Sequence, residues 1–122
     1  MKNWYRELKN RYSSFDKHLQ ILNVVSDLQK AKNLSTMNKQ SSINHCYRAM
    51  ILLDYIIADD RWKRKLKELL RLREAIGSHI AHTSPFATFD QLIAATLLLD
   101  CKAYKIVRNV EQRSKEEIEN RE

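Results

Sequence analysis

An arginine and a histidine six positions apart, Arg73 and His79, are the side chains best suited to chemistry. An arginine can stabilise the negative charge that grows on phosphorus during phosphoryl transfer. A histidine, whose pKa lies close to neutrality, can move protons between a ribose 2′-OH, the phosphate and the leaving oxygen. Such a pair could therefore cleave RNA without a metal ion, and we take Arg73 and His79 as candidate catalytic residues.

The spacing of this pair resembles the motif of the HEPN superfamily of helical-bundle proteins. In that motif an arginine is followed by a polar residue and, after four to six positions, by a histidine; Arg73, Glu74 and His79 fit this form. The resemblance implies a four-helix bundle that pairs as a homodimer, with two Arg–His motifs facing each other in a basic cleft and cutting RNA without metal. Many members of the superfamily instead bind nucleotides or RNA, or act as toxin components.

Helical geometry sets a condition on this chemistry. On an ideal α-helix, two side chains six positions apart point about 120° away from each other. Arg73 and His79 would therefore converge only if Gly77 breaks the helix between them, or if a second subunit supplies the partner group. The sequence leaves open whether the chain is an enzyme.

A dense run of positive charge precedes the candidate pair. Residues 60–73 contain seven basic side chains against Asp60 and Glu68. On a continuous α-helix, Lys63, Lys67 and Arg71 would form one outward stripe, because they recur at steps of four. Such a stripe can follow phosphates, although the run could also be an ordinary solvated helix face. The residues predicted to bind nucleic acid are Arg61, Lys63, Arg64, Lys67 and Arg71.

Other side chains near this run have simpler interpretations. Trp62 could stack on a base or pack in the core, and its four-residue step to Leu66 favours the core. His79 and His82 stand at a spacing that two metal ligands could use, but zinc needs three or four ligands. No spacing brings further ligands to them, so we predict no metal site and no cofactor.

The turn-forming residues are nearly absent, which predicts an all-α fold. The 122 residues include one glycine and one proline, and no Asn-Gly or Asp-Gly pair occurs. β-Sheets depend on such residues in their turns. We therefore expect a four-helix bundle with antiparallel neighbours, formed by a single domain over residues 1–110. Residues 111–122 would be a charged tail, either a frayed helix or disordered.

Four helices are expected from apolar periodicity and capping signals. The first covers about residues 3–32, where apolar side chains recur at steps of four and three. The second starts near Ser41 or Ser42, ends near residue 57, and is apolar nearly all round in its second half, so it should be the most buried. Asp54 interrupts that run and needs a partner, such as an arginine from another helix.

The last two helices are predicted from the residues at their starts. The third should run from Asp59 or Asp60 to about residue 82, with acids at its start and cations further along, as suits the helix dipole. The fourth begins with a capping box formed by Thr88 and Gln91 and continues to about residue 110. Its wide apolar surface favours a homo-oligomer.

Charge and cysteine content indicate the partner and the compartment. The formal net charge is +7; residues 111–122 carry −2, so the remaining chain carries +9. This balance favours a nucleic acid as partner, although a soluble protein can also simply be basic. No apolar run approaches the ~20 residues that cross a membrane. Cys46 and Cys101 show no CxxC pattern and are expected to be free, buried thiols in a reducing cytoplasm.

Three functions fit these features. The first is a HEPN-like, metal-independent endoribonuclease or toxin component, which favours RNA over DNA. The second is a non-catalytic oligomeric adaptor that holds nucleic acid for a larger protein partner, such as a polymerase, a reverse transcriptase or an effector complex. The third is a protein–protein module whose charge only aids solubility.

Overall fold

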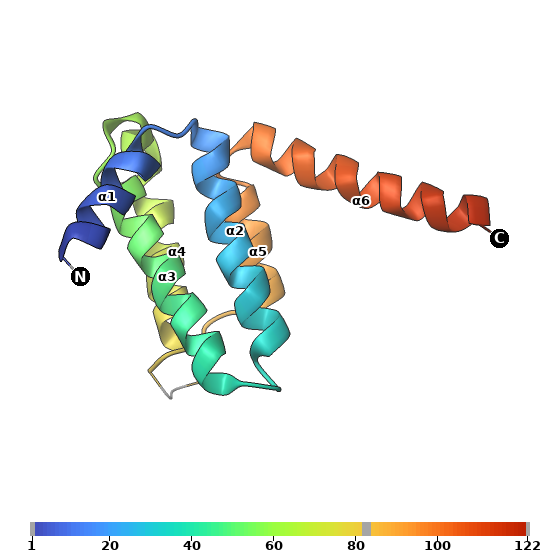
Figure 1. Cartoon of the computed structure of the whole chain (residues 1–122), viewed down its shortest axis with the longest axis horizontal. Helices are drawn as coiled ribbons and strands as arrows, with labels where there is room; N and C mark the ends of the chain where they lie inside the picture. The colour runs from blue at the N-terminus through green and yellow to red at the C-terminus, as the bar shows by residue number, and fades with distance from the viewer. Residues whose placement is uncertain (1, 82–83, 122) are drawn as a thin grey trace.

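The computed structural model describes residues 2–81 and 84–121, with the side chains of residues 7–81 and 84–120. Every regular element in these ranges is helical, which confirms the all-α class (Figure 1). The elements are α1 (Lys2–Ser13), α2 (Lys17–Leu34), α3 (Lys39–Ile57), the 3₁₀ segment η1 (Asp60–Lys65), α4 (Leu66–Ser78), α5 (Phe89–Leu97) and α6 (Cys101–Arg121). None of the helices so described is long and apolar enough to cross a membrane.

Helices α2 and α3 lie at the centre of the molecule and contact each other most extensively. Helix α5 packs on α2, and α4 packs on α3, so α2 to α5 form the body of the molecule (Figure 1). Helix α1 lies across α3, while α6 begins beside α2 and then points away from the body. The fully buried aliphatic side chains come from α2, α3 and α4; they include Ile21, Val24, Leu28, Leu53, Ile56, Leu69 and Ile76.

The expected first helix is two helices, α1 and α2. The chain leaves the α conformation after Ser13, and Asp16 is extended with φ −60° and ψ 151°. The Ser14 hydroxyl donates a hydrogen bond to the Arg11 carbonyl over 2.7 Å. A serine side chain that bonds the preceding turn in this way competes with helix continuation, which a count of apolar steps does not register.

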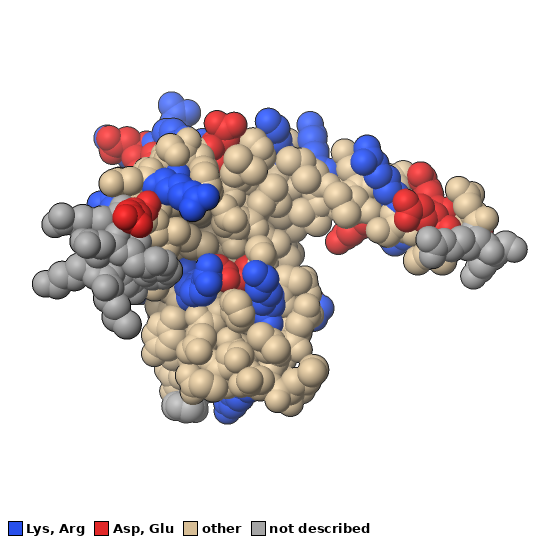
Figure 2. Space-filling view, viewed as in Figure 1, with Lys and Arg blue, Asp and Glu red and all other residues tan. Residues whose placement is uncertain are grey.

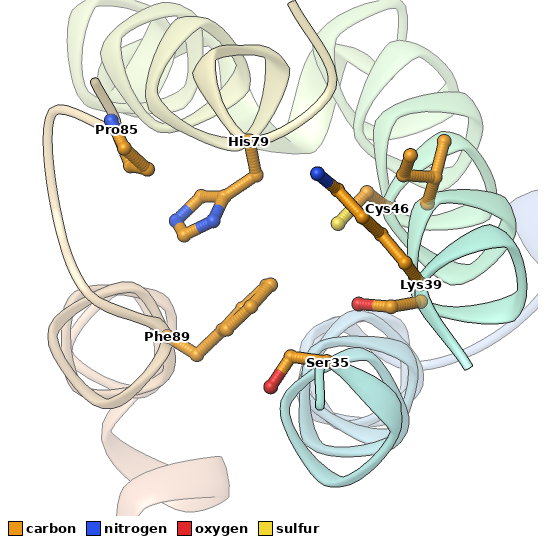
Figure 3. A pocket seen from close by; sticks show the side chains of 8 residues that line it. Ser35, Lys39, Cys46, His79, Pro85 and Phe89 are labelled. Carbon is orange, nitrogen blue, oxygen red and sulfur yellow. The ribbon is translucent and has the colours of Figure 1, made fainter. Parts of the chain in front are cut away.

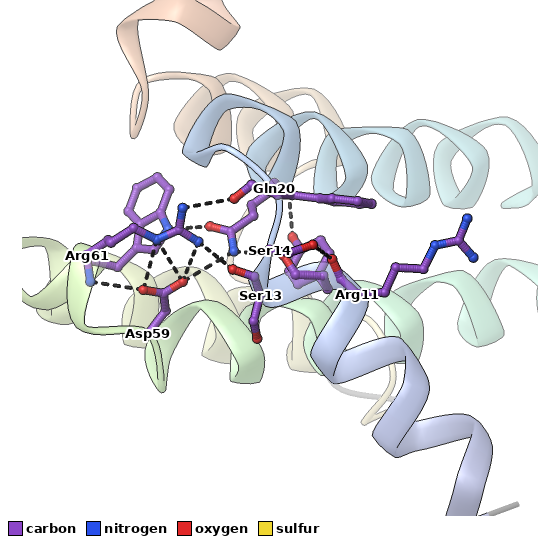
Figure 4. Close-up of polar contacts among 9 residues, drawn as sticks. Arg11, Ser13, Ser14, Gln20, Asp59 and Arg61 are labelled. Atoms are coloured by element: carbon purple, nitrogen blue, oxygen red, sulfur yellow. Dashed lines mark hydrogen bonds and ion pairs between the residues drawn. The ribbon is translucent and has the colours of Figure 1, made fainter.

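The expected third helix starts where predicted, with Asp59 as the cap, but it is divided into two helical segments and ends earlier than predicted. Residues 60–65 form the 3₁₀ segment η1, and the α-helix begins only at Leu66, after Lys65 departs from helical geometry at φ −107° and ψ 13°. Helix α4 ends at Ser78, and residue 82 lies outside the described ranges. Figure 4 shows the physical reason at its start: Arg61 and Trp62 are held by polar contacts to α2 and to the α1–α2 connection.

The expected fourth helix is also divided, and the tail is helical. The capping box of Thr88 and Gln91 is confirmed, with both of its hydrogen bonds present. Helix α5 ends at Leu97, and a new helix begins at Cys101, where the Asp100 carboxylate accepts the amide hydrogen of Ala103. Helix α6 then continues to Arg121, through most of the segment expected to be a frayed helix or disordered.

Helix α3 begins earlier than predicted. Its cap is Asn38, whose side chain accepts the amide hydrogen of Ser41, rather than Ser41 or Ser42. The Ser42 hydroxyl is buried and donates to the Ala31 carbonyl over 2.7 Å, so it joins α3 to α2. Helix α3 is buried on one side only, because Tyr47 is 50% exposed.

A buried glutamine joins three segments that are distant in sequence (Figure 4). The Gln20 side chain is fully buried; its Oε1 accepts a hydrogen bond from Trp62 Nε1 over 2.7 Å, and its Nε2 donates to the Tyr12 carbonyl over 3.1 Å. The Tyr12 hydroxyl donates in return to the Gln20 carbonyl. Trp62 is 1% exposed, which confirms the core position expected for it and leaves it unable to stack on a base.

Replacing this glutamine should destabilise the protein strongly. Gln20→Leu keeps the volume but leaves the Trp62 indole N–H buried without a partner, which costs about 1–3 kcal/mol, and removes one of the two hydrogen bonds to the Tyr12 carbonyl, which keeps the amide of Phe15. We expect the free energy of unfolding to fall by about 3 kcal/mol in urea denaturation. Gln29→Leu is the matched control, because Gln29 lies on the same helix, is exposed, and its side chain donates to Asn33 over 3.1 Å. Equal stability of the two variants would contradict the structural role of Gln20.

Candidate functional site

Most of the predicted basic residues are exposed around η1 and the start of α4. Four of them and the neighbouring Lys65 have no ion pair among the described side chains; the five are Lys63, Arg64, Lys65, Lys67 and Arg71. We call these five residues the basic patch. Lys65 was absent from the predicted set. That set was built around a stripe of residues at steps of four, which assumes a continuous α-helix, whereas residues 60–65 form a 3₁₀ segment. Arg64 and Glu68, four positions apart, form no ion pair within the described residues.

The position of the patch on its helix is electrostatically unfavourable. Because α4 starts at Leu66, four of the five cations flank its first turn, where the helix dipole is positive. The sequence had suggested the opposite arrangement, with acids at the helix start. No side chain caps this end of α4. The cations therefore do not stabilise α4. A helix selected for stability alone would have acids rather than cations at this end.

Charge elsewhere is unevenly distributed over the surface. On the face shown in Figure 2, charged side chains are frequent along α6 and at the upper end of the body, and sparse over its lower half. Apart from the local pair of Arg61 with Asp59, the ion pairs of the described residues join helices: Lys32 on α2 meets Asp90 on α5 over 2.7 Å. The buried carboxylate of Asp27 contacts His45 over 3.1 Å and Arg48 over 3.6 Å.

Arg61, also predicted to bind nucleic acid, is engaged in the fold (Figure 4). Its guanidinium donates to both oxygens of Asp59, to the Phe15 carbonyl over 2.9 Å and to the Ser13 carbonyl over 3.0 Å. The hydrogen bond from Arg61 lowers the pKa of Asp59 to about 2, and the same bond raises the pKa of Arg61. Arg61 therefore secures the α1–α2 connection rather than presenting its charge to a ligand.

Arg73 is held by a carboxylate on the neighbouring helix. Its Nε donates to Asp54 Oδ1 over 2.6 Å and a terminal nitrogen donates to Oδ2 over 3.3 Å, which is a bidentate ion pair. This hydrogen bonding raises the pKa of Arg73. The expectation that Asp54 pairs with an arginine of another helix is confirmed, but Asp54 is exposed rather than buried.

His79 stands at the end of α4 and is also engaged locally. Its Nε2 lies 2.7 Å from the Ala87 carbonyl, and its ring stacks on Phe89 with centroids 4.1 Å apart. A carbonyl oxygen only accepts, so Nε2 carries the hydrogen and Nδ1 is the nitrogen left to act as a base in the neutral ring. Together with Ser78, whose hydroxyl accepts the amide hydrogen of Phe86 over 3.0 Å, His79 ties the end of α4 to the segment before α5.

The two candidate catalytic residues do not share a site within one subunit. Helix α4 continues through Gly77 to Ser78, so the break that would turn Arg73 towards His79 is absent. Arg73 faces α3 through Asp54, whereas His79 faces α5 through Phe89. Of the two conditions under which Arg73 and His79 could converge, only the contribution of a second subunit remains.

His79 instead lines a pocket between α3, α4 and α5 (Figure 3). The pocket has a volume of about 320 Å³, and the side chains of Lys39, His79 and Phe89 face the same space. Cys46 lies at its base, and burial raises the pKa of this thiol to about 11, which leaves it protonated and weakly nucleophilic at neutral pH. Cys101, by contrast, is exposed, so only one of the two thiols is buried as expected.

The described residues contain no group of three or more His, Cys, Asp or Glu side chains that could hold a metal ion. Comparison of the chain with family models, with curated proteins and with solved structures finds no match. The basic patch is therefore the feature on which a function can be argued, because its charges are exposed, unpaired among the described side chains and unhelpful to the fold.

The structural role of Arg61 can be separated from that of its neighbour. Arg61→Ala removes hydrogen bonds to Asp59 and to two carbonyls and should lower the free energy of unfolding by about 2 kcal/mol at neutral pH. Arg64→Ala, at an exposed position without an ion pair among the described side chains, should change it by less than about 0.5 kcal/mol.

The pH dependence gives a second measurement of the same interaction. The folded-state pKa of Asp59 lies near 2, below its ordinary value of 3.8, so its ionised form stabilises the folded state. The stability difference between wild type and Arg61→Ala should therefore be fully present above pH 4 and should shrink as the pH falls towards 2. Urea denaturation at several pH values measures it; a difference that stays constant across this window would contradict the assignment.

Proposed function

We propose that this protein is a helical bundle that binds nucleic acid, with RNA as the expected ligand, through the basic patch and without cleaving it. In this proposal α2 to α5 are the four helices of the bundle, with antiparallel neighbours, and the chain is a cytoplasmic adaptor that presents nucleic acid to a larger protein partner. The observation that carries it is the cluster of five exposed cations without ion pairs among the described residues. Charges that cost helix stability and lack acidic partners suit a polyanionic ligand.

The location of the cations favours contacts with the phosphate backbone rather than with bases. Trp62, the aromatic residue nearest to the patch in sequence, is buried and unavailable for stacking. Lysine and arginine side chains that are exposed and flexible neutralise phosphates without reading sequence. We therefore expect binding with little sequence preference and a strong dependence on salt.

Reversal of two charges in the patch should weaken RNA binding. With five phosphates contacted, the logarithm of the binding constant for single-stranded RNA should fall with the logarithm of salt concentration at a slope of about −3.5. Lys63→Glu/Lys67→Glu should bind more weakly and reduce that slope by at least about 1.4. Fluorescence anisotropy of a labelled RNA, titrated at several salt concentrations, measures both quantities; duplex DNA serves as the competing ligand.

The matched control changes the same charge elsewhere. Lys105→Glu/Arg108→Glu reverses two exposed cations on α6, which points away from the body, and should bind RNA nearly as wild type does. A stability measurement adds a second criterion: Lys67→Glu places an acid in the first turn of α4 and should raise the free energy of unfolding by about 0.5 kcal/mol while weakening binding. No binding by wild type at physiological salt, or equal losses in both double variants, would overturn the proposal.

Cleavage of RNA is a separate candidate activity, which the HEPN-like spacing of Arg73 and His79 suggests. Within one subunit each residue is engaged elsewhere, so cleavage would require a partner subunit and the release of Arg73 from Asp54. We expect wild type, Arg73→Ala and His79→Ala all to bind RNA and none to cleave it in the presence of EDTA. Cleavage by wild type that both substitutions abolish would show an enzyme instead of an adaptor.

A further inference from the structure

The body of the molecule has an open apolar side between α4 and α5. A groove of about 640 Å³ runs there, lined mainly by aliphatic and aromatic side chains: Leu72, Ala75, Phe86, Leu92, Ala95 and Leu98. Phe86 is 67% exposed and Leu98 is 71% exposed. Phe86 precedes α5 and Leu98 follows it, and large apolar side chains that are open to water beside a groove are typical of an interaction surface.

The packing of the body explains why this side is open. Helix α4 packs on α3 and α5 packs on α2, so each of them is supported from its inner side. The two helices are joined to each other at one end, where Ser78 bonds the amide of Phe86 and His79 bonds the carbonyl of Ala87. Beyond that end the groove extends between them, lined by Leu72 and Ala75 of α4 and by Leu92 and Ala95 of α5.

Helix α6 has an apolar face that continues past the body. Ala103 is fully buried and Val107 is half-buried against the core, so the first turns of α6 are fixed beside α2. Val110 and Ile118 extend the same face of the helix but are 57% and 60% exposed. Figure 1 shows that this part of α6 has no neighbour, so an apolar stripe leads from the core into solvent.

The charges of the two features are complementary. Residues 111–120 carry four glutamates against Arg113 and Lys115, whereas the chain before residue 111 has a net charge of +9. Lys65 and Arg71 stand at the rim of the groove, with Glu68 as the one acid there. An acidic, apolar-faced helix and a basic-rimmed apolar groove are the two sides of a helix-in-groove contact.

We propose that the free part of α6 from one copy of this chain lies in the α4–α5 groove of a second copy, and that the second copy returns the same contact. Such an exchange forms a symmetric dimer in which both copies bury the same surfaces. The helix cannot fill the groove of its own chain without losing the contacts of Ala103 and Val107 with the body. A second copy is therefore the occupant that keeps every contact present in one subunit.

This dimer does not depend on nucleic-acid binding. Lys65 and Arg71 belong to both the basic patch and the rim of the groove, whereas Lys63, Arg64 and Lys67 do not line the groove, so the charge reversals that test RNA binding leave its lining unchanged. A failure of RNA binding and a failure of dimerisation would therefore be seen in different measurements and on different variants.

Sedimentation velocity of the full chain over a range of concentrations tests the exchange. Wild type should be a dimer, and Val110→Asp/Ile118→Asp should raise the dimer dissociation constant by more than roughly 100-fold, because the contact occurs twice per dimer. Asn109→Asp/Gln112→Asp is the matched control: it adds the same two charges to the opposite face of α6 and should leave the dimer intact. Circular dichroism should be unchanged in both, because all four positions are exposed.

A disulfide experiment identifies the occupant. On a Cys101→Ser background, one preparation carries Ala95→Cys in the groove and the other carries Val110→Cys or Ile118→Cys on α6. Oxidation of the mixture should give a cross-linked dimer that neither preparation gives alone. A monomeric wild type, a dimer that Val110→Asp/Ile118→Asp leaves unchanged, or a cross-link that forms only within one chain carrying both cysteines would overturn the proposal.

Discussion

The hydrogen bond between the buried amide of Gln20 and the indole of Trp62 constrains the path of the segments around it. Trp62 has to reach the core beside α2, so residues 60–65 wind tightly as η1 instead of extending α4. Arg61 then lies over the α1–α2 connection and binds its carbonyls. A single fully satisfied polar cluster thus fixes the end of α1, the entry to α2 and the first residue of α4, because a buried amide is costly unless all its partners are present.

The late start of α4 changes the meaning of the neighbouring charges. If the helix began at Asp60, the cations would lie within it and acids would stand at its positive end. Because it begins at Leu66, lysines and arginines surround that end, and their mutual repulsion adds to the unfavourable interaction with the helix dipole. The two arginines that do stabilise the fold, Arg61 and Arg73, each have a carboxylate partner. Within one short segment, the paired cations therefore stabilise the fold, and the cations without ion pairs among the described side chains are exposed.

The sequence predicted the features that depend on local chemistry. The shortage of glycine and proline predicted the all-α class, and Thr88 with Gln91 predicted a helix start. It did not predict the break at Lys65, which depends on contacts of Arg61 and Trp62 with distant residues, nor the breaks at Ser14 and Leu98. For the candidate site, exposure of Lys63 and Lys67 followed from the pattern. The engagement of Arg61 and Arg73 did not, because their acidic partners come from other parts of the fold.

The short length and one-sided support of α5 have a consequence for motion. This helix has nine residues, its support in the body is α2, and it faces the open groove on its other side. A short helix that packs mainly on one neighbour can open without global unfolding. Its backbone amides should therefore exchange with solvent faster than those of α2 and α3, and the residues that line the groove belong to the part of the body that fluctuates most readily.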